Sequence, residues 1–245
     1  MTFTKIAMLL QADASALEIR VAAFLSGDEV LINEIINGVD LHTDNQKKFG
    51  LPSRLIAKIL NFRILYGGNE FSFANDPEFT AISTSKVYWK EVIDAYYDKY
   101  KGIRKWHSHI IKGVVETGKM TSPLGREYRF ERYNGTYKDT QIKNYSVQGS
   151  GADLMAIARV SAMGRIKKLG YGNQCLFVNT VHDSIVLDYN DKVCDTNTLI
   201  KTFEEVFSDL PKNVEKLFGI KFNVPMACEC QKGLNWKDME VVHAN

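Results

Sequence analysis

The sequence is short of cysteine and proline, carries little net charge and contains no long apolar run. Its 245 residues include four cysteines and five prolines, and the formal net charge is only +2. The cysteines lack the spacing of a zinc site, so we expect reduced structural thiols. The N-terminal run MTFTKIAMLL is too short for a membrane span or a signal peptide. These features predict a cytoplasmic protein without a membrane anchor.

The order of apolar patterns predicts an α+β protein. At 245 residues the chain can bury a full core and form one or two compact units. Helical patterns cover roughly residues 15–24, 29–36, 54–66, 85–116, 140–169 and 196–218, and strand-like patterns cover 5–11, 176–187 and 220–229. A hairpin is expected around residues 123–126. Helices set between strands that are distant in sequence favour the α+β class.

One segment, RLIAKILNFRILYGG, places Arg54, Lys58, Phe62 and Tyr66 at successive four-residue steps. On an α-helix these side chains share one slowly spiralling face, which drifts by about 40° at each step. Two cations at one end can bind a polyphosphate, while the ring and the phenol can stack on a base and a sugar. The pattern predicts a nucleotide-binding helix. The alternative is an ordinary amphipathic helix with solvated cations.

Two aspartates are expected at turns next to strand-like runs. Asp13 follows the apolar run 6–10, and Asp183 lies between two apolar runs in CLFVNTVHDSIVLDY, where a tight hairpin is expected. A carboxylate at the end of a buried strand is costly to bury without a cation, which makes each aspartate a candidate metal ligand. Each could also be an ordinary turn residue, and Ser15 to Glu18 fits a capping box.

The two aspartates and the cationic helix together suit one chemistry. Two carboxylates can hold a pair of divalent ions about 3.5–4 Å apart, which stabilise the attacking and leaving oxygens of an in-line phosphoryl displacement. Mg²⁺ suits this role because it prefers a few carboxylates together with water and substrate phosphates. The combination predicts nucleotidyl transfer with two Mg²⁺ ions.

These motifs resemble those of the family A DNA polymerases, the group of bacterial DNA polymerase I and many phage replicative polymerases. DASALEIR resembles the first family motif, R-x-x-x-K-x-x-x-F-x-x-x-Y-G the second and VHDS the third, while GLNWKDM resembles the closing segment. Their order and intervals fit over essentially the whole chain. The resemblance implies an α+β fold in which residues 1–40 and 136–245 form a palm with an antiparallel sheet. Residues 41–135 would form a helical fingers insertion that contains the helix 54–66.

The resemblance also assigns catalytic roles. Asp13 and Asp183 would ligate the two Mg²⁺ ions, with the backbone carbonyl of Ala14 as an extra ligand. Arg54 and Lys58 would clamp the triphosphate of a dNTP. Lys58 would in addition neutralise or protonate the departing pyrophosphate.

Further residues match positions around the incoming nucleotide. Phe62 would lie against its sugar and base, and Tyr66 would pack at the bottom of the base-pair pocket beside Glu18. Glu18 would block a ribose 2′-hydroxyl and so select deoxynucleotides, a role that competes with the capping box. His42, in GVDLHT, matches a histidine that reaches the triphosphate.

Contacts with primer–template DNA are implied for a third group. Asn144 and Gln148 match positions in the minor groove, where contacts test pair geometry rather than sequence. His182 matches a residue that helps to position the primer end. Between Lys99 and Asn144, eleven Lys/Arg stand against four Asp/Glu, with aromatic residues between them. This basic stretch, which includes Arg126, suits a DNA backbone, although a solvated face is the alternative.

The chain also departs from the family pattern. Ser184 stands where the third motif normally ends in glutamate, so no third carboxylate is expected there. Only twelve residues precede Asp13, whereas the family places a thumb and usually an exonuclease-like domain before the first motif. We therefore expect either a split polymerase, whose thumb and exonuclease would be carried by a separate N-terminal chain, or a fragment of a longer polymerase. In either case we expect a bacterial or phage-infected cell and no 3′–5′ exonuclease in this chain.

Two other functions stay open. One is a nucleotide- or DNA-binding remnant that has lost catalysis and needs a partner chain. Ser184 and the missing domains favour it, while the intact Asp13, Lys58 and Asp183 oppose it. The other is a polymerase-fold terminal transferase, which template-independent extension would distinguish.

Overall fold

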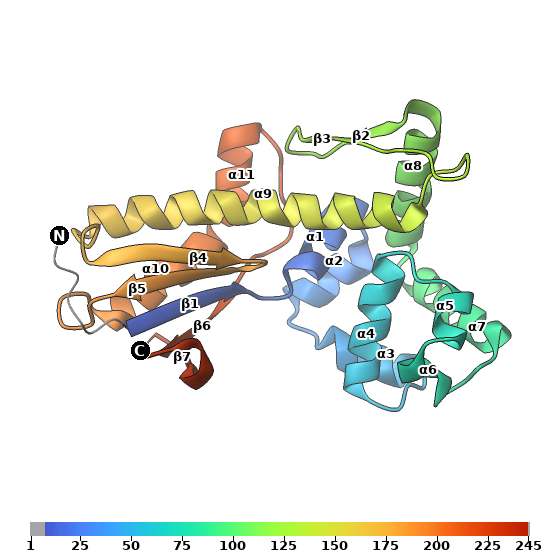
Figure 1. Cartoon of the computed structure of the whole chain (residues 1–245), viewed down its shortest axis with the longest axis horizontal. Helices are drawn as coiled ribbons and strands as arrows, with labels where there is room; N and C mark the ends of the chain where they lie inside the picture. Colours follow the sequence, from blue (N-terminus) through green and yellow to red (C-terminus); the bar gives the residue numbers. More distant parts are fainter. Residues whose placement is uncertain (1–7, 245) are drawn as a thin grey trace. The chain divides into compact units, whose positions relative to one another are not determined.

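The computed structural model describes residues 8–244, and the chain divides into two compact units. One unit contains the chain up to Leu17 and again from Gly151 onward, and the other is Glu18–Ser150. The long helix α9 (Asp139–Lys168) contributes residues to both units (Figure 1). The predicted palm and fingers boundaries describe functional domains and stay a prediction.

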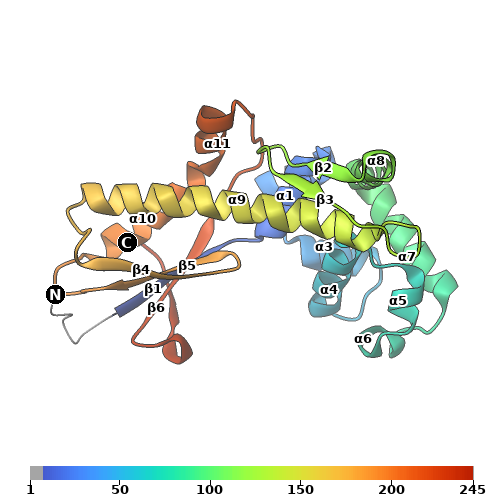
Figure 2. The same ribbon diagram turned by 45° about the horizontal axis from the view of Figure 1, so that its top comes forward.

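The first unit is built on a five-stranded antiparallel sheet with the order β4-β5-β1-β6-β7 (Figure 1). Its strands are β1 (Met8–Ala14), β4 (Cys175–Val181), β5 (Ser184–Tyr189), β6 (Cys228–Gly233) and β7 (Glu240–Val242). Its helices are α10 (Thr196–Ser208), α11 (Leu210–Phe218) and the short 3₁₀ helix η1 (Trp236–Asp238). The second half of α9 runs next to β4 in both ribbon views (Figure 2).

The central strand β1 has one covered and one open face. Leu10, Ala12 and Ala14 are fully buried, while the residues between them are only half-buried. This alternation follows from the two-residue period of a strand. Helix α10 packs against β1 and β6 and supplies buried side chains such as Phe203. Asp13 therefore lies on the opposite face of β1, which is the less buried one.

The hairpin predicted around Asp183 is confirmed. Strands β4 and β5 pair up to Val181 and Ser184, which leaves a two-residue turn of His182 and Asp183. The backbone of His182 has a φ of 51°, a left-handed conformation that such tight turns use. Asp183 therefore lies at the tip of the hairpin.

The second unit is mostly helical. Its helices are α1 (Leu17–Ser26), α2 (Glu29–Ile36), α3 (Leu41–Lys48), α4 (Arg54–Leu65), α5 (Glu70–Ala74), α6 (Pro77–Thr80), α7 (Lys86–Lys99) and α8 (Lys101–Thr117), followed by the first half of α9. The hairpin predicted at residues 123–126 is confirmed, with strands β2 (Lys119–Thr121) and β3 (Glu127–Arg129). The α+β class is confirmed by these helices and the antiparallel sheet.

Aromatic packing joins α5, α6 and α7. The rings of Phe73, Phe79 and Trp89 are fully buried, with centroid separations of 4.9, 5.3 and 5.4 Å. Edge-to-face and offset ring pairs of this kind stabilise a core beyond the area that they bury. The cluster gives a short-helix region, which the sequence patterns did not predict, a core of its own.

Two predicted helices are each broken into two. The helix expected over residues 85–116 ends at Lys99 and resumes at Lys101, because Tyr100 leaves the helical conformation with φ −110° and ψ 70°. The helix expected over residues 196–218 is interrupted after Ser208, where a proline occupies the first turn of α11. Proline lacks the N–H that would continue the preceding helix.

The strand expected over residues 220–229 is wrong for most of its length. Phe222, Val224 and Met226 are buried in alternation, which imitates a strand, but only Cys228–Gly233 pairs with β1. Pro225 cannot donate a ladder hydrogen bond in this stretch. The first strand also differs: β1 extends to Ala14, so Asp13 lies within the strand rather than on a turn after it. Residues 5–7 of the predicted strand lie outside the described residues.

Within the described residues, none of the helices combines the length and the apolar character that a membrane crossing requires.

Two glycines on α8 give a test of the packing in the second unit. The N–H of Gly102 donates to Asp28 Oδ2 at 2.6 Å, and a Cβ at Gly102 would lie 2.7 Å from Asp28 Cα. We expect Gly102→Ala to lower the free energy of unfolding by about 1–3 kcal/mol through overpacking. Gly113→Ala, with open space around its Cβ, should raise it by about 0.5–1 kcal/mol through helix propensity. Urea unfolding measures both, and equal effects would contradict the close approach of α8 to Asp28.

Candidate active site

The structure brings Asp13 and Asp183 together. Asp13 is the penultimate residue of β1 and pairs in register with Ser184, the residue that follows Asp183. The N–H of Ala14 donates to the carbonyl oxygen of Asp183 at 2.8 Å, which fixes the hairpin tip against the end of β1. The two carboxylates are close enough to interact directly. The sheet thus joins two carboxylates from distant parts of the sequence.

The environment of Asp13 opposes its ionisation. Burial is the main cause, followed by the negative charges of Asp183 and Glu229, and together they raise the pKa of Asp13 to about 6. A carboxylate whose charged form is penalised by burial and by like charges is well suited to a cation, which removes both penalties. Among the aspartates of residues 8–244 whose pKa clearly departs from the ordinary value, Asp13 is the one whose pKa is raised, and burial is the largest cause.

Glu229 is a site residue that the sequence patterns did not single out. It lies on β6 directly opposite Asp13, so the two side chains share the open face of the sheet. The sequence placed Glu229 at the end of a longer strand, and only the observed register shows which residue faces Asp13. Ser184, opposite Asp13 on the other side, is buried, and its hydroxyl donates to the carbonyl of Val181 at 3.0 Å.

The chemistry of this group suits Mg²⁺. No cluster of three or more His, Cys, Asp or Glu side chains arranged to hold a metal ion is present among residues 8–244. Mg²⁺ does not need such a cage, because it is usually held by one or two carboxylates plus water and substrate phosphates. Asp13 and Asp183 therefore have the ligand chemistry that Mg²⁺ prefers.

Helix α4 carries the predicted nucleotide-binding face in the second unit. Ser53 caps its first turn by accepting a hydrogen bond from the N–H of Ile56 at 3.2 Å. Arg54 and Lys58 are exposed at the start of the helix, while Phe62 and Tyr66 at its end are half-buried. The predicted helix is confirmed, with Tyr66 as its C-cap residue.

Asp40 links the starts of two helices. Its Oδ1 accepts hydrogen bonds from the N–H groups of His42 and Thr43 and so caps α3, while its Oδ2 contacts Nε of Arg54 at 2.7 Å. The Arg54 guanidinium holds the pKa of Asp40 well below its usual range. This pair is about half-exposed, so a phosphate can replace the carboxylate as the partner of Arg54 at small cost.

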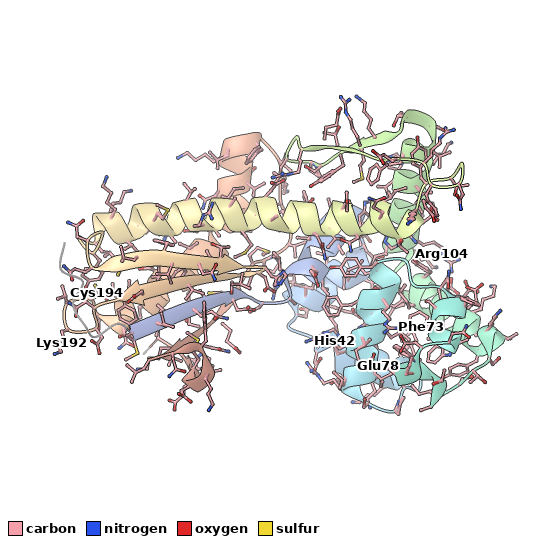
Figure 3. The ribbon with its side chains drawn as sticks, in the orientation of Figure 1. His42, Phe73, Glu78, Arg104, Lys192 and Cys194 are labelled. Atoms are coloured by element: carbon pink, nitrogen blue, oxygen red, sulfur yellow. The ribbon has the colours of Figure 1, made fainter. Side chains whose placement is uncertain are left out.

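His42 lies in the first turn of α3 beside the face of α4 (Figure 3). Its ring centroid is 6.1 Å from that of Phe62, and its Nδ1 lies 3.1 Å from Nδ2 of Asn61. Burial and the nearby cations, first Arg54 and then Lys58, lower the pKa of His42, against an opposing effect of Asp40. These effects favour the neutral form of the imidazole.

The phenol oxygen of Tyr66 is buried and has no hydrogen-bond partner within the described residues, but Glu18 lies near enough to act on it electrostatically. Burial and the Glu18 carboxylate raise the pKa of the Tyr66 phenol well above its usual value, and Gln148 on α9 acts against this shift. Glu18 stands in the first turn of α1. The structure thus gathers Glu18, Tyr66 and Gln148 from three helices into one group.

The remaining predicted DNA-binding residues lie on α9 and on two hairpins. Asn144 is half-buried on α9, one turn before Gln148 and on the same side of the helix. Arg126 is exposed at the turn between β2 and β3, and His182 is exposed at the tip of the β4–β5 hairpin. The carboxylates and His182 belong to one compact unit, and the α4 face, Asn144 and Arg126 belong to the other.

One unit carries a pair of carboxylates on a strand and a hairpin of an antiparallel sheet, and the other unit carries a helix that presents two cations. Residues 2–238 match the family described as DNA polymerase family A. The chain belongs to DNA polymerase family A, and the resemblance seen in its motifs is confirmed.

Individual relatives agree with this assignment. The chain is 27% identical to DNA polymerase I of Caldicellulosiruptor bescii over 94% of its own length, and 31% identical to the thermostable DNA polymerase I of Thermus filiformis over 85%. Each match spans 26% of the relative, so the chain covers about a quarter of these proteins. A solved structure is similar in fold, with a TM-score of 0.78 and 21% identity: the POL domain of Pol1 from M. smegmatis, in complex with DNA primer–template and dNTP. That similarity covers 96% of this chain and 41% of the solved chain.

The raised pKa of Asp13 predicts a pH-dependent gain in stability from its removal. Because the folded-state pKa of about 6 exceeds the ordinary 3.8, the stability that Asp13 contributes is present below pH 4 and lost as pH rises through 6. In Mg²⁺-free buffer at pH 7.5, Asp13→Asn should therefore raise the free energy of unfolding by about 1 kcal/mol, discounted for partial exposure. The gain should vanish near pH 4.

Urea unfolding at the two pH values measures this difference. Asp191→Asn is the matched control, because Asp191 is exposed in the same unit and should show no gain at either pH. A gain in Asp13→Asn of equal size at both pH values would show that charge is not its cause.

Proposed function

We propose that this chain catalyses template-directed DNA synthesis, by nucleotidyl transfer from a dNTP to the 3′ end of a primer. The observation that carries the proposal is the pairing of Asp13 and Asp183 at one end of the sheet, with burial and mutual repulsion that favour a bound cation. Family membership supports it, and so does the POL domain of Pol1, which was solved with primer–template and dNTP.

Asp13 and Asp183, with the Ala14 carbonyl, would hold two Mg²⁺ ions. When bound, these ions would stabilise the attacking and leaving oxygens of the in-line displacement. The ionised forms of both carboxylates are needed for this role, and the pKa of about 6 for Asp13 means that a cation competes with a proton below neutral pH.

Arg54, Lys58 and His42 would bind the triphosphate. Arg54 can exchange its half-exposed contact with Asp40 for a phosphate, because charge-assisted contacts of guanidinium to phosphate are strong and directional. Lys58 is exposed one turn further along α4, where its ammonium can neutralise or protonate the leaving pyrophosphate. Phe62 would then lie against the sugar and base.

Glu18 and Tyr66 would select the sugar. Burial and the Glu18 carboxylate raise the pKa of the Tyr66 phenol, which supports a close approach of the two side chains. A ribose 2′-hydroxyl directed at this pair would clash with the side chains of Glu18 and Tyr66. Asn144, Gln148, His182 and Arg126 would contact the primer–template, the first two through the minor groove.

Primer extension tests the reaction. With a labelled primer, a DNA template, Mg²⁺ and four dNTPs, we expect template-directed extension that Asp183→Ala and Lys58→Ala reduce by at least about 10²-fold, since each removes a group that acts on the transferring phosphoryl group. Asp191→Ala, an exposed aspartate of the same unit, should retain wild-type activity.

Two results would contradict the proposal. dNTP binding without extension at high enzyme concentration would indicate a binding remnant that lacks catalysis. Extension that does not depend on the template would indicate a terminal transferase.

Sugar selection has its own test. We expect Glu18→Ala to raise the ratio of rNTP to dNTP incorporation by about 10- to 200-fold, the range that removal of a steric contact in a pocket gives. Glu18→Gln keeps the volume and should change the ratio far less. Glu91→Ala, at an exposed glutamate on α7, is the surface control. A ratio that is unchanged in Glu18→Ala would remove Glu18 from the sugar gate.

A further inference from the structure

Three buried polar side chains run through the core of the helical unit. Asn45 on α3, Asn61 on α4 and Lys99 at the end of α7 are 1%, 4% and 5% exposed. Lys99 Nζ lies 2.7 Å from Asn45 Oδ1, Asn45 Nδ2 lies 3.0 Å from Asn61 Oδ1, and Asn61 Nδ2 lies 3.1 Å from Nδ1 of His42. These contacts form one continuous chain of hydrogen bonds from a cation to an imidazole.

The cation fixes the direction of every bond in this chain. An ammonium group can only donate, so the amide oxygen of Asn45 must face Lys99. The amide nitrogen of Asn45 must then face Asn61. The Asn61 oxygen accepts, and its nitrogen is left to donate to His42.

His42 can satisfy that donor in only one neutral form. Nδ1 must accept, so the ring proton must lie on Nε2. The amide of Asn61 thus determines which edge of the imidazole carries the N–H. The charge at the far end is itself secured, because Lys99 contacts the carboxylates of Glu34 at 2.9 Å and Asp44 at 2.7 Å.

The desolvation cost of burying two amides and an ammonium group indicates that this series of hydrogen bonds has a functional role. A buried amide or ammonium is stable only when its hydrogen-bonding groups are satisfied, and aliphatic side chains would fill the same space without that requirement. The groups around His42 on the ligand side are Asp40, Arg54 and Lys58, and the ring of Phe62 lies beside it. A neutral Nε2–H among the two cations is a donor that complements an anionic phosphate.

We propose that Asn61 is a positioning residue that, through Asn45 and Lys99, holds His42 as its Nε2–H tautomer, so that this N–H is available to the dNTP triphosphate. The inference rests on the proposed function for the identity of the ligand. The tautomer itself is a property of the free protein. An imidazole with its proton on Nδ1 would instead turn a lone pair toward the phosphate.

The tautomer can be read directly. Two-bond ¹⁵N–¹H spectra of protein with ¹⁵N-labelled histidine distinguish the Nε2–H, Nδ1–H and doubly protonated forms, and loss of signals in His42→Ala assigns His42 among the five histidines. At pH 7.5 we expect the Nε2–H form in the wild type. An Nδ1–H form would overturn the inference, whatever the polymerase activity, and His42→Ala is the one variant that this measurement needs, for assignment.

Variants test whether Asn61 sets the tautomer. Asn61→Asp replaces the donor by a carboxylate, so Nδ1 of His42 should become protonated. Asn69→Asp adds the same charge at an exposed N-cap, where aspartate is equally accepted, and should leave His42 unchanged. Asn61→Leu removes the donor and should give a mixture of tautomers. A pure Nε2–H form in Asn61→Leu would show that Asn61 does not determine it.

Binding completes the test. We expect Asn61→Leu to weaken dTTP binding, measured by calorimetry in Mg²⁺ buffer, by the inverse of the fraction of His42 that stays in the Nε2–H form, about twofold for an equal mixture, because the ligand selects that form. In a His42→Ala background the same change should have almost no further effect, because Asn61 acts through His42. A loss of the same size in that background would overturn the positioning role. Wild-type protein that binds dTTP with the Nε2–H tautomer but never extends a primer would overturn the proposed function and leave the role of Asn61 intact.

Discussion

The two-sided pairing of β1 is the constraint on which the carboxylate site depends. β1 is held between β5 and β6, and both registers place Asp13 on the same row, opposite Ser184 on one side and Glu229 on the other. Because side chains alternate along a strand, a slip of one residue would turn Asp13 toward the covered face and Ala12 toward the ligand. Leu10, Ala12 and Ala14 are fully buried under α10, so the apolar face of the strand prevents that slip. The position of a charged group is thus set by its apolar neighbours.

The helical unit solves the same problem with polar groups. Asp40 serves both as the N-cap of α3 and as the partner of Arg54, so the two helix starts that carry His42 and Arg54 are fixed by one carboxylate. Deeper in the unit, the Asn45–Asn61 contact joins the same two helices through their cores. Amide pairs specify a register more strictly than aliphatic contacts do, because a shifted pair leaves both amides unsatisfied. The proposed triphosphate site would gain from such precision in its framework.

The sequence was most informative where chemistry and periodicity coincide. The helix 54–66 and the hairpin at Asp183 could be predicted because a strong pattern and a clear turn signal lie next to the reactive residues. Glu229 could not, since nothing in CECQKG states which residue pairs with Asp13; strand register is decided by contacts between distant segments. The strand predicted over residues 220–227 is absent although alternate residues there are buried. Burial of alternate residues does not require hydrogen bonds to a neighbouring strand, so the pattern alone is misleading. The directed bonds from Lys99 to His42 could not be predicted either, because they join residues that are 54, 16 and 19 positions apart in the sequence.

This chain has Ser184 where the third family motif normally ends in glutamate. The difference affects the electrostatics of the site more than its framework. The serine hydroxyl donates to Val181 and closes the hairpin, so the turn that holds Asp183 keeps a local hydrogen bond. A glutamate at that position would add a carboxylate next to Asp13 on the β5 side, where Asp183 and Glu229 already raise the pKa of Asp13. More negative charge would strengthen the attraction for a cation but would also raise the cost of the metal-free fold. With Ser184 at this position, the negative charges that act on Asp13 are those of Asp183 at the hairpin tip and Glu229 on β6.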